Sequence, residues 1–551
     1  MTADFADTTV PGMLYAHMSA PPSALAPIAA AASNERPRNQ TEVFAVHGAD
    51  PEVLAYAMAR YSRSSLSMKE SLREISSQRA EQFLNTFYFQ YGHRSIADLA
   101  HVAFAIERLS LLAAIVLVDE QRWDGQERST RYQNFQKSGW YLPPFGAAYQ
   151  AEQTYTRTVE ALFTAYHEVS EGVFASMRDH TPKPEEMKQE SFERTLRARA
   201  FDVARYLLPL AANTSLGQIV NARTLETQVS RLLSDPHAEI RELGERLRAA
   251  ATGPAWNVHA EEAAELYADL RGINQELATR AESLLGREVK VAPTLVKYAS
   301  PNVYELETRC ELAQAAAELM GGAPIAQSPV VDLVERTLGR GTESLEVEIA
   351  ATLLYGACHY SYRQVRDGVA ALSAKRRAEI LDLGVHNRGK HDELLREFAS
   401  GHALRFDILM DIGGFRDMHR HRRCIQVMQG FTAAHGLDTP DGLHRAGLVG
   451  IYEQATHAAH EAFAALAASD SPEAAHTAQY VLPLGTRCRA LFKMDFAEAL
   501  YISELRSAPQ GHFSYRRVAW EMYEAVKRQH PQLARYFRIK DVNEHVDLLK
   551  R

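Results

Sequence analysis

The sequence has few of the features that mark secreted, zinc-binding or membrane-spanning proteins. Among 551 residues there are four cysteines, and they are too widely spaced to form the close pairs of a zinc site. They are Cys310, Cys358, Cys424 and Cys488. We therefore expect reduced thiols and a cytoplasmic location. There is no basic start followed by an apolar core and a cleavage site, so we do not expect secretion.

The charge balance excludes two further classes of partner. The formal net charge is -8, whereas general nucleic-acid binders and binders of anionic membranes need basic surfaces. A long apolar run at 102–118 contains Glu107 and Arg108 in its middle, which argues against a membrane span. With 46% hydrophobic and 24% charged residues, the chain has the composition of a globular protein of two to four domains.

A basic segment follows a second apolar run. Residues 407–412 are largely apolar, Gly413 and Gly414 follow, and residues 419–423 are all basic. Arginine offers a rigid fork of donors that suits phosphate oxygens, and histidine adds a further donor. We interpret the segment as a clamp for the diphosphate of a nucleotide cofactor. The alternative interpretation is a solvated basic turn.

Several elements can be predicted from local pattern. Residues 1–40 are rich in Ala, Pro and Ser and predict a flexible tail. Helices are expected from Pro51, over 66–91, over about 151–180 and within 330–377, and residues 102–118 are expected to form a strand that leads into a helix.

Four patterns occur twice in the same order, which predicts an internal duplication. The pairs are Ala49–Val53 with Ala299–Val303, Arg205–Leu210 with Gln479–Leu484, Arg231 and His237 with Arg506 and His512, and the apolar run before Asp119 with the run before Arg420. We predict a first domain at 41–250, a helical connector at 251–292 and a second domain at 293–551.

Ordered motifs in both copies resemble the flavin-dependent thymidylate synthase (ThyX) family. The motifs are Tyr91-Gly92-His93-Arg94-Ser95, Glu127-Arg128-Ser129-Thr130-Arg131-Tyr132, Ala204-Arg205-Tyr206-Leu207-Leu208-Pro209, Asn221-Ala222-Arg223, Pro236-His237-Ala238-Glu239-Ile240-Arg241 and Arg420-His421-Arg422. The resemblance implies a helix-rich α+β fold of two tandem domains, each a mixed sheet flanked by helices.

The resemblance also implies a chemistry. In that family FAD and dUMP bind together where four subunits meet, methylenetetrahydrofolate supplies the carbon and NADPH is the reductant. No protein nucleophile is needed, so the protein's work is orientation and electrostatics.

The resemblance assigns roles to particular residues. Substrate binding falls to Glu127, Ser129, Arg131, Tyr132 and Arg205. Cofactor binding falls to His93, Asn221, Arg223, His237, Arg420, His421, Arg422 and His512. Arg231, Arg506 and Ser129 are the expected catalytic residues, with the two arginines aligned to the one that polarises the uracil. No metal site is expected, because His419 and His421 lie among arginines.

Each copy departs from the family pattern in a different place. The first has Asp119-Glu120-Gln121 where the family has Arg-His-Arg. The second has Gly430-Phe431-Thr432-Ala433 in place of Ser-x-Arg-Tyr, and Gln479 in place of Arg205. The losses are complementary. We therefore predict one composite site that draws on both copies, and a homodimer that reproduces the four-unit assembly.

Two alternatives to dUMP methylation remain open. The first is a flavin enzyme of the same design that acts on another pyrimidine or transfers a hydroxymethyl group. The second is a catalytically silent protein that binds nucleotide or flavin. Individual residues also have structural alternatives: helix or turn capping for His93, Ser129 and His237, surface ion pairs for Arg205 and Arg506, and general acid–base roles for Asp119 and Glu120.

Overall fold

In a computed structural model, the chain from Ala49 onward is built around two main antiparallel sheets that are flanked by helices. The structure describes residues 48–60, 72–73, 82, 84–85, 94–334, 337–338, 341–342, 345–389, 395–398, 404–535, 537–544 and 547–549. The predicted tail, His93 and most of the predicted helix over 66–91 therefore lie outside the described residues. The domain boundaries drawn from the sequence stay predictions.

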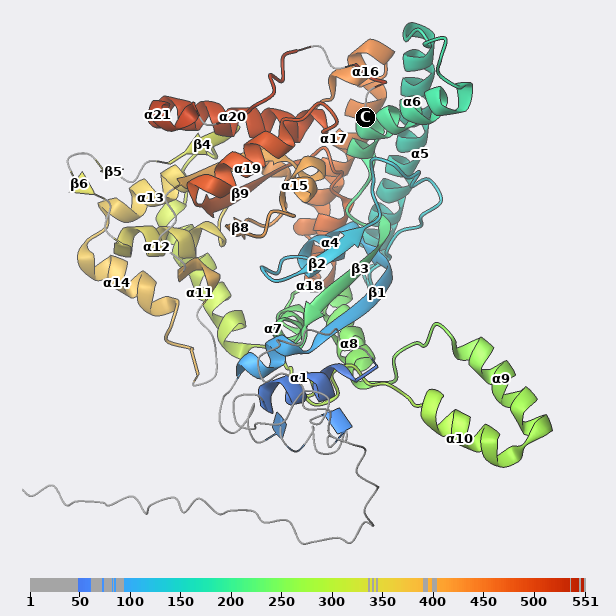
Figure 1. The fold of residues 1–551 in the computed structure, drawn as a ribbon. Coiled ribbons are helices and arrows are strands. Elements are labelled where there is room, and N and C mark those ends of the chain that lie inside the picture. Colours follow the sequence, from blue (N-terminus) through green and yellow to red (C-terminus); the bar gives the residue numbers. More distant parts are fainter. Residues whose placement is uncertain are drawn as a thin grey trace, which may run out of the picture. The chain divides into compact units, whose positions relative to one another are not determined.

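The first repeat is built around a three-stranded sheet in the order β1-β3-β2 (Figure 1). It is preceded by α1 (Pro51–Arg60) and the short 3-10 helix η2 (Arg94–Leu99). Its elements are β1 (His101–Ser110), α4 (Leu111–Leu117), β2 (Asp124–Glu127), α5 (Tyr149–His180), α6 (Gln189–Ala204), η3 (Arg205–Leu207), β3 (Asn213–Asn221), α7 (Ala222–Leu233) and α8 (Ala238–Thr252). The strand-to-helix prediction over 102–118 and the helix predicted near 151–180 are confirmed.

The second repeat follows the same order of elements around a sheet β4-β7-β9-β8. It contains β4 (Val331–Leu333), β7 (Leu404–Asp411), α15 (Ile412–Met418), β8 (Ile425–Met428), η5 (Ala433–His435), α16 (Asp441–Ala446), α17 (Val449–Ala467), α18 (Pro472–Thr477), η6 (Ala478–Val481), β9 (Arg487–Met494), α19 (Phe496–Arg506), α20 (Phe513–Gln529) and α21 (Pro531–Ala534). This shared order confirms the tandem duplication. The expected mixed sheets are wrong: every strand pair in the described residues is antiparallel.

The predicted connector is helical and holds α9 (Ala260–Ile273) and α10 (Gln275–Leu285). The second repeat begins with α11 (Val303–Met320), and an insertion between its strands β4 and β7 holds β5 (Thr337–Leu338), β6 (Gly341–Thr342), α12 (Leu345–Tyr355), α13 (Tyr362–Ala371), α14 (Ala374–Leu383) and η4 (Arg396–Phe398). The helical stretch predicted over 330–377 is therefore wrong at its start, where β4 pairs with β7. Val331 and Leu333 are buried there and Asp332 between them is half-buried, but a strand of three residues is too short for this alternation to distinguish it from a helix.

Polar caps fix where the helices start. The Ser110 side chain accepts from the Ala113 amide at the start of α4, and the Asp411 side chain accepts from the Gly414 amide at the start of α15. Gly413 and Gly414 do not end the apolar run but form the first turn of α15. A Cβ on Gly414 would lie 2.7 Å from Ser514 Oγ and 2.8 Å from Met410 Cε, so a larger residue would require these side chains to move.

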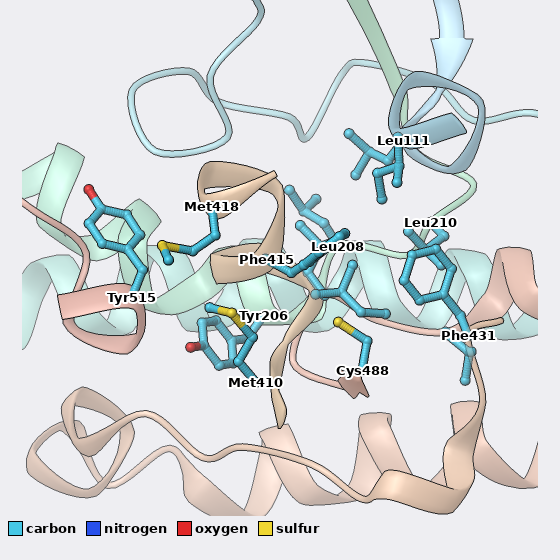
Figure 2. Packing of buried hydrophobic residues seen from close by; sticks show 14 of the residues in the cluster. Leu111, Tyr206, Leu208, Leu210, Met410, Phe415, Met418, Phe431, Cys488 and Tyr515 are labelled. Atoms are coloured by element: carbon cyan, nitrogen blue, oxygen red, sulfur yellow. The ribbon is translucent and has the colours of Figure 1, made fainter. Parts of the chain in front are cut away.

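The two repeats are joined by backbone hydrogen bonds between two buried segments, 206–211 and 480–485. The Leu210 amide donates to the Leu482 carbonyl and the Leu484 amide donates to the Leu208 carbonyl, each at 2.9 Å. Side chains of both repeats share one hydrophobic core, in which Leu208 and Leu210 lie near residues such as Phe415 and Cys488 (Figure 2). Burial of apolar surface from both repeats therefore stabilises them as one folding unit.

Truncating a side chain at this junction should destabilise the whole chain. Leu208 is 0% exposed, so Leu208→Ala should lower the free energy of unfolding by about 2–5 kcal/mol through lost burial and the cavity left behind. Urea unfolding measures this. The control is Leu142→Ala, because Leu142 is 47% exposed and should change stability by less than about 0.5 kcal/mol. Equal effects of the two changes would contradict a shared core.

Candidate functional site

The two segments that correspond to the Arg-His-Arg motif each follow the end of a short helix, α4 in the first repeat and α15 in the second. α4 ends at Leu117, just before Asp119-Glu120-Gln121, and α15 ends at Met418, just before Arg420-His421-Arg422. Both helices follow a capped strand end and precede a short strand, β2 or β8. The two segments therefore occupy equivalent places in the two repeats, as the sequence pattern predicts.

Arginines of both repeats surround Asp417, at the last turn of α15. Arg205 Nη1 donates to Asp417 Oδ2 at 3.3 Å and to Thr130 Oγ1 at 3.4 Å. Burial alone would raise the pKa of Asp417, but the guanidinium groups nearby lower it below its ordinary value. Those groups belong to Arg205, Arg131, Arg506 and Arg420. We call Arg131, Arg205, Asp417, Arg420 and Arg506 the arginine cluster.

Arg131 connects the first repeat's loop to α20 of the second. Its Nε donates to Asp202 Oδ1 at 2.6 Å, and its Nη1 donates to the Tyr515 hydroxyl at 2.8 Å. The guanidinium carbons of Arg131 and Arg506 lie 5.6 and 5.3 Å from the centre of the Tyr515 ring. Arg131, predicted to bind the nucleotide, and Arg506, predicted to be catalytic, therefore both contact the Tyr515 ring.

His421 is held in one tautomer. Its Nε2 accepts from Arg506 Nε at 2.8 Å, so the ring proton of the neutral imidazole is on Nδ1, 3.7 Å from Glu498 Oε1. Burial lowers the pKa of His421, and Arg506 and Arg422 lower it further. The ring is therefore neutral near pH 7 and can donate only through Nδ1.

A small recess lies beside the basic segment and is also lined by both repeats. Its walls are Ile115, Val118, Trp123, Glu127, Arg416, His419, Arg420 and Arg422. Arg422 stacks over the Trp123 ring at 4.2 Å, and Arg416 forms an ion pair with Glu127. Burial lowers the pKa of Arg422 to about 10, which still leaves it charged. The recess measures about 10 Å³, room for roughly one water.

Several buried guanidinium donors of the recess and of the arginine cluster have no hydrogen-bond acceptor among the described residues. They are Nε and Nη2 of Arg205, Nε of Arg416 and Nε of Arg422. A buried unsatisfied donor costs about 1–3 kcal/mol, so native proteins normally supply a partner. Guanidinium donors of this kind match the oxygens of a phosphate or diphosphate.

The equivalent place in the first repeat is neutralised by ion pairs. Arg231 Nη2 lies 2.8 Å from Glu120 Oε1, and Arg396 Nη1 lies 2.6 Å from Asp119 Oδ1. Burial would raise the pKa of Asp119, but Arg396 and His419 hold it well below its usual range. Arg231 is therefore bound to Glu120 and not joined to the arginine cluster. The ion pairs favour a structural role for both carboxylates over general acid–base chemistry.

The other predicted residues lie in different surroundings. Asn221 caps α7, and Arg223 lies 3.5 Å from Asp98. His237 Nδ1 contacts Asp235 Oδ1 at 2.7 Å, whereas His512 Nε2 contacts the Asp202 carbonyl at 3.0 Å beside Arg131. Ser129 Oγ accepts from the Arg131 amide, and Tyr132 is 53% exposed. Arg205 is only 1% exposed, so the surface ion-pair alternative is wrong for it.

The residues of these clusters that were not predicted from the sequence include Asp202, Arg396, Arg416, Asp417 and Tyr515. Asp417 lies three residues before Arg420, within the segment that the sequence did single out, and Tyr515 lies three residues after His512. Helical spacing would place each of them on the same face as its neighbour. Arg396 has no such signal, because it lies in the segment between β4 and β7 of the second repeat and meets Asp119 only through the fold.

Comparison with known proteins identifies relatives of two lengths. A family model described as "Thymidylate synthase complementing protein" matches residues 45–253 and 347–532. A UPF0159 protein of Chlamydia muridarum is 27% identical over 528 residues, covering 90% of this chain and 91% of that protein. A UPF0159 protein of Thermoplasma acidophilum is 25% identical, covering 89% and 95%. A flavin-dependent thymidylate synthase of Clostridium tetani is 25% identical over 177 residues, or 32% of this chain and 67% of that protein.

Among solved structures, thymidylate synthase X of Helicobacter pylori with FAD and dUMP is similar to part of the chain. The match is 17% identical, with a TM-score of 0.23, and covers 37% of this chain and 90% of that chain. No helix in the described part of the chain is long and apolar enough to cross a membrane. The described residues also contain no group of three or more His, Cys, Asp or Glu side chains that could hold a metal ion.

A buried histidine near the second repeat's diverged loop predicts a pH dependence. His435 is 0% exposed, and burial lowers its pKa from 6.5 to about 3. Because the unfolded chain binds this proton near pH 6.5 and the folded chain does not, His435 lowers stability as the pH falls from 6.5 toward 3. His435→Gln should therefore remove about 1–3 kcal/mol of the stability loss between pH 7 and pH 4.

Urea unfolding at several pH values measures that difference. His476→Gln is the matched control, because His476 is an exposed histidine of the same repeat. An identical loss of stability on acidification in the His435 variant and the unmodified protein would show that this ring titrates freely in the fold.

Proposed function

Because the chain belongs to the thymidylate synthase complementing protein family, we propose that it is a flavin-dependent thymidylate synthase-like enzyme with one composite site. The proposed reaction methylates dUMP to dTMP, with methylenetetrahydrofolate as carbon donor, NADPH as reductant and FAD as cofactor. The observation that carries this proposal is the arginine cluster. It joins Arg131 and Arg205 of one repeat to Arg420 and Arg506 of the other around Asp417.

The nucleotide half of the site is assigned to the first repeat. Arg131 and Arg205 would hold the phosphate and pyrimidine oxygens of dUMP, with Ser129 and Tyr132 on the same loop as Arg131 and Glu127 at the end of β2 just before it. The unpartnered Nε and Nη2 of buried Arg205 support this assignment, because they are donors without an acceptor. Arg506 is favoured over Arg231 as the arginine that polarises the uracil, since Arg231 is bound to Glu120.

The cofactor half is assigned to the basic segment of the second repeat. Arg420, His421 and Arg422 would hold the diphosphate of FAD, with Arg416 as an additional donor that the sequence did not suggest. The donor set fits a diphosphate, but the recess of about 10 Å³ does not enclose a dinucleotide. We therefore propose a homodimer in which a second copy completes the flavin pocket. Bound flavin would supply the carbon-transfer and hydride chemistry, and the protein would orient both ligands.

A second candidate function has its own support. The arginines of the cluster already meet acidic partners, with Arg131 on Asp202 and Arg205 on Asp417. A site that is neutralised from within fits a protein that has lost its anionic ligands and keeps only the architecture. A related enzyme could act on another pyrimidine, which changes the substrate, or transfer a hydroxymethyl group, which changes the reaction because the transferred carbon then takes up water instead of a hydride.

Flavin content separates an enzyme from a silent protein. The purified protein should be yellow with the absorbance band of oxidised flavin, and the double change His421→Ala with Arg422→Ala should abolish it, because the diphosphate loses two donors. Arg423→Ala is the control, since Arg423 is exposed and pairs with Asp495. dUMP-dependent release of tritium from C5-labelled dUMP then tests the substrate. A colourless protein that does not take up added FAD would refute the flavin proposal.

Nucleotide binding should depend on Arg131 independently of flavin. Arg131→Ala removes a phosphate donor and should weaken dUMP binding by on the order of 100-fold while flavin is retained, as measured by calorimetry on the flavin-loaded protein. The change also leaves Asp202 without its ion-pair partner. Asp202→Asn breaks the same pair but keeps the guanidinium, and it should bind dUMP nearly normally. If both variants lost dUMP affinity to a comparable extent, the loss would come from the broken Arg131–Asp202 ion pair and not from the missing guanidinium group.

A further inference from the structure

A second cavity lies where the two repeats meet, and other residues line it than those of the arginine cluster and the recess. It measures about 70 Å³, compared with about 10 Å³ for the recess, and so has room for roughly five waters. The first repeat lines it with the loop at 141–144 and the turn that leads into α8, and the second repeat lines it with α18 and η6. None of the residues assigned above to dUMP or to the flavin diphosphate lines it.

His237 lines this cavity and has one unpaired ring nitrogen. Its side chain is 8% exposed, and its Nδ1 lies 2.7 Å from Asp235 Oδ1. A carboxylate only accepts, so the ring proton is on Nδ1, and Nε2 of the neutral ring is an acceptor that faces away from Asp235. Nε2 is buried and has no hydrogen-bond partner among the described residues. A buried polar atom of this kind normally has a bound water or ligand as its partner.

The equivalent histidine of the second repeat is hydrogen-bonded at both ring nitrogens. His512 Nε2 contacts the Asp202 carbonyl at 3.0 Å, and its Nδ1 accepts from a backbone amide of α20. The His512 ring stacks on Tyr206 with an angle of 24° between the rings, whereas His237 meets Tyr480, the counterpart of Tyr206, edge-on at 82°. The unpaired Nε2 therefore belongs to one repeat and is not a general property of the duplicated fold.

Hydrogen-bond donors lie on the α8 side of the cavity. Arg241 Nη1 donates to the carbonyls of Asp235 and Pro236 at 2.8 and 2.7 Å, which fixes the guanidinium against the turn and leaves its Nε and Nη2 for another acceptor. α8 begins at Ala238 without a side-chain cap, and the amides of its first turn have no acceptor within the helix. The 15 residues of α8 add a partial positive charge at this end.

The carboxylates beside the cavity have donors of their own. Glu239 accepts from the Ser110 amide at 2.8 Å and from Ser110 Oγ at 2.6 Å. It also accepts from the Tyr480 hydroxyl at 2.9 Å. Asp235 accepts from the amide and the ring of His237. Hydrogen bonds to both carboxylates therefore reduce their repulsion of a further anion.

We propose that this cavity binds a phosphate group. A hydrogen phosphate carries both kinds of group that the cavity calls for: a hydroxyl that donates to His237 Nε2, and oxygens that accept from Arg241 and from the first amides of α8. A phosphate has five non-hydrogen atoms, and the cavity has room for roughly five waters. The site is separate from the flavin and dUMP chemistry proposed above and does not depend on it.

Thermal unfolding with added phosphate tests the site. The midpoint should rise with inorganic phosphate and level off at roughly millimolar concentration, and sodium chloride at the same ionic strength should not reproduce the rise. Arg241→Gln should weaken phosphate binding by on the order of 10-fold, because a charge-assisted donor is lost. Arg246→Gln is the matched control, since Arg246 is exposed on the same helix beyond its first turn and should leave phosphate binding unchanged.

Hydrogen exchange locates the bound phosphate, because the arginine cluster also offers donors to this anion. Amides at 238–241 should exchange more slowly with phosphate in the unmodified protein and in Arg131→Ala, but not in Arg241→Gln. Glycerol 3-phosphate in parallel distinguishes a phosphate ester from the free ion as the ligand.

Two results would overturn the inference. If neither compound raised the midpoint beyond the effect of chloride, the cavity would hold only water. If Arg241→Gln kept the full rise, the phosphate would bind elsewhere. Flavin absorbance and dUMP binding of each variant are measured separately, so failure of this site and failure of the proposed enzyme remain distinguishable.

Discussion

The pairing of segment 206–211 with segment 480–485 determines how the rest of the molecule is arranged. Four backbone amides cross between repeats here: Leu210 to Leu482, Ala211 to Tyr480, Leu484 to Leu208 and Gly485 to Tyr206. Buried backbone groups must be hydrogen-bonded, so a shift in register would leave several unsatisfied. Because Arg205 directly precedes this junction, its position against Asp417 of the other repeat follows from the register.

The two repeats keep an equivalent hydrogen bond between a hydroxyl and a carboxylate at a helix start, but the residues that supply the two groups have changed places. At the start of α4 the Ser110 hydroxyl donates to Glu239 Oε2 at 2.6 Å, whereas at the start of α15 the Ser514 hydroxyl donates to the Asp411 carboxylate. Donor and acceptor have thus changed places between equivalent positions. The signature segments diverged likewise. Asp119 and Glu120 of the first repeat stand where the second repeat has basic residues, and they bind Arg396 and Arg231. The buried charges remain compensated in each case.

The local sequence pattern was sufficient to predict several of the helices and strands. The run at 102–118, the periodicity before His180 and the proline at residue 51 each predict their element, because strand and helix periods depend on near neighbours. The direction of strand pairing was wrong, and the start of the 330–377 stretch was wrong, since both depend on a partner strand far along the chain. For the candidate site, the sequence pointed to Arg131, Arg205 and Arg420 but not to Asp417, the carboxylate between them.

By itself, the sequence determined which chemical groups each repeat retained: hydroxyl and arginine residues at 129–131 in the first, and the basic segment at 420–422 in the second. Only the tertiary structure decided which of these groups meet. Arg506 reaches His421 and Tyr515, while Arg231, its counterpart in the sequence pattern, is bound to Glu120. The physical reason is that ion pairs act over a few ångströms, and the repeat junction sets those distances between residues hundreds of positions apart.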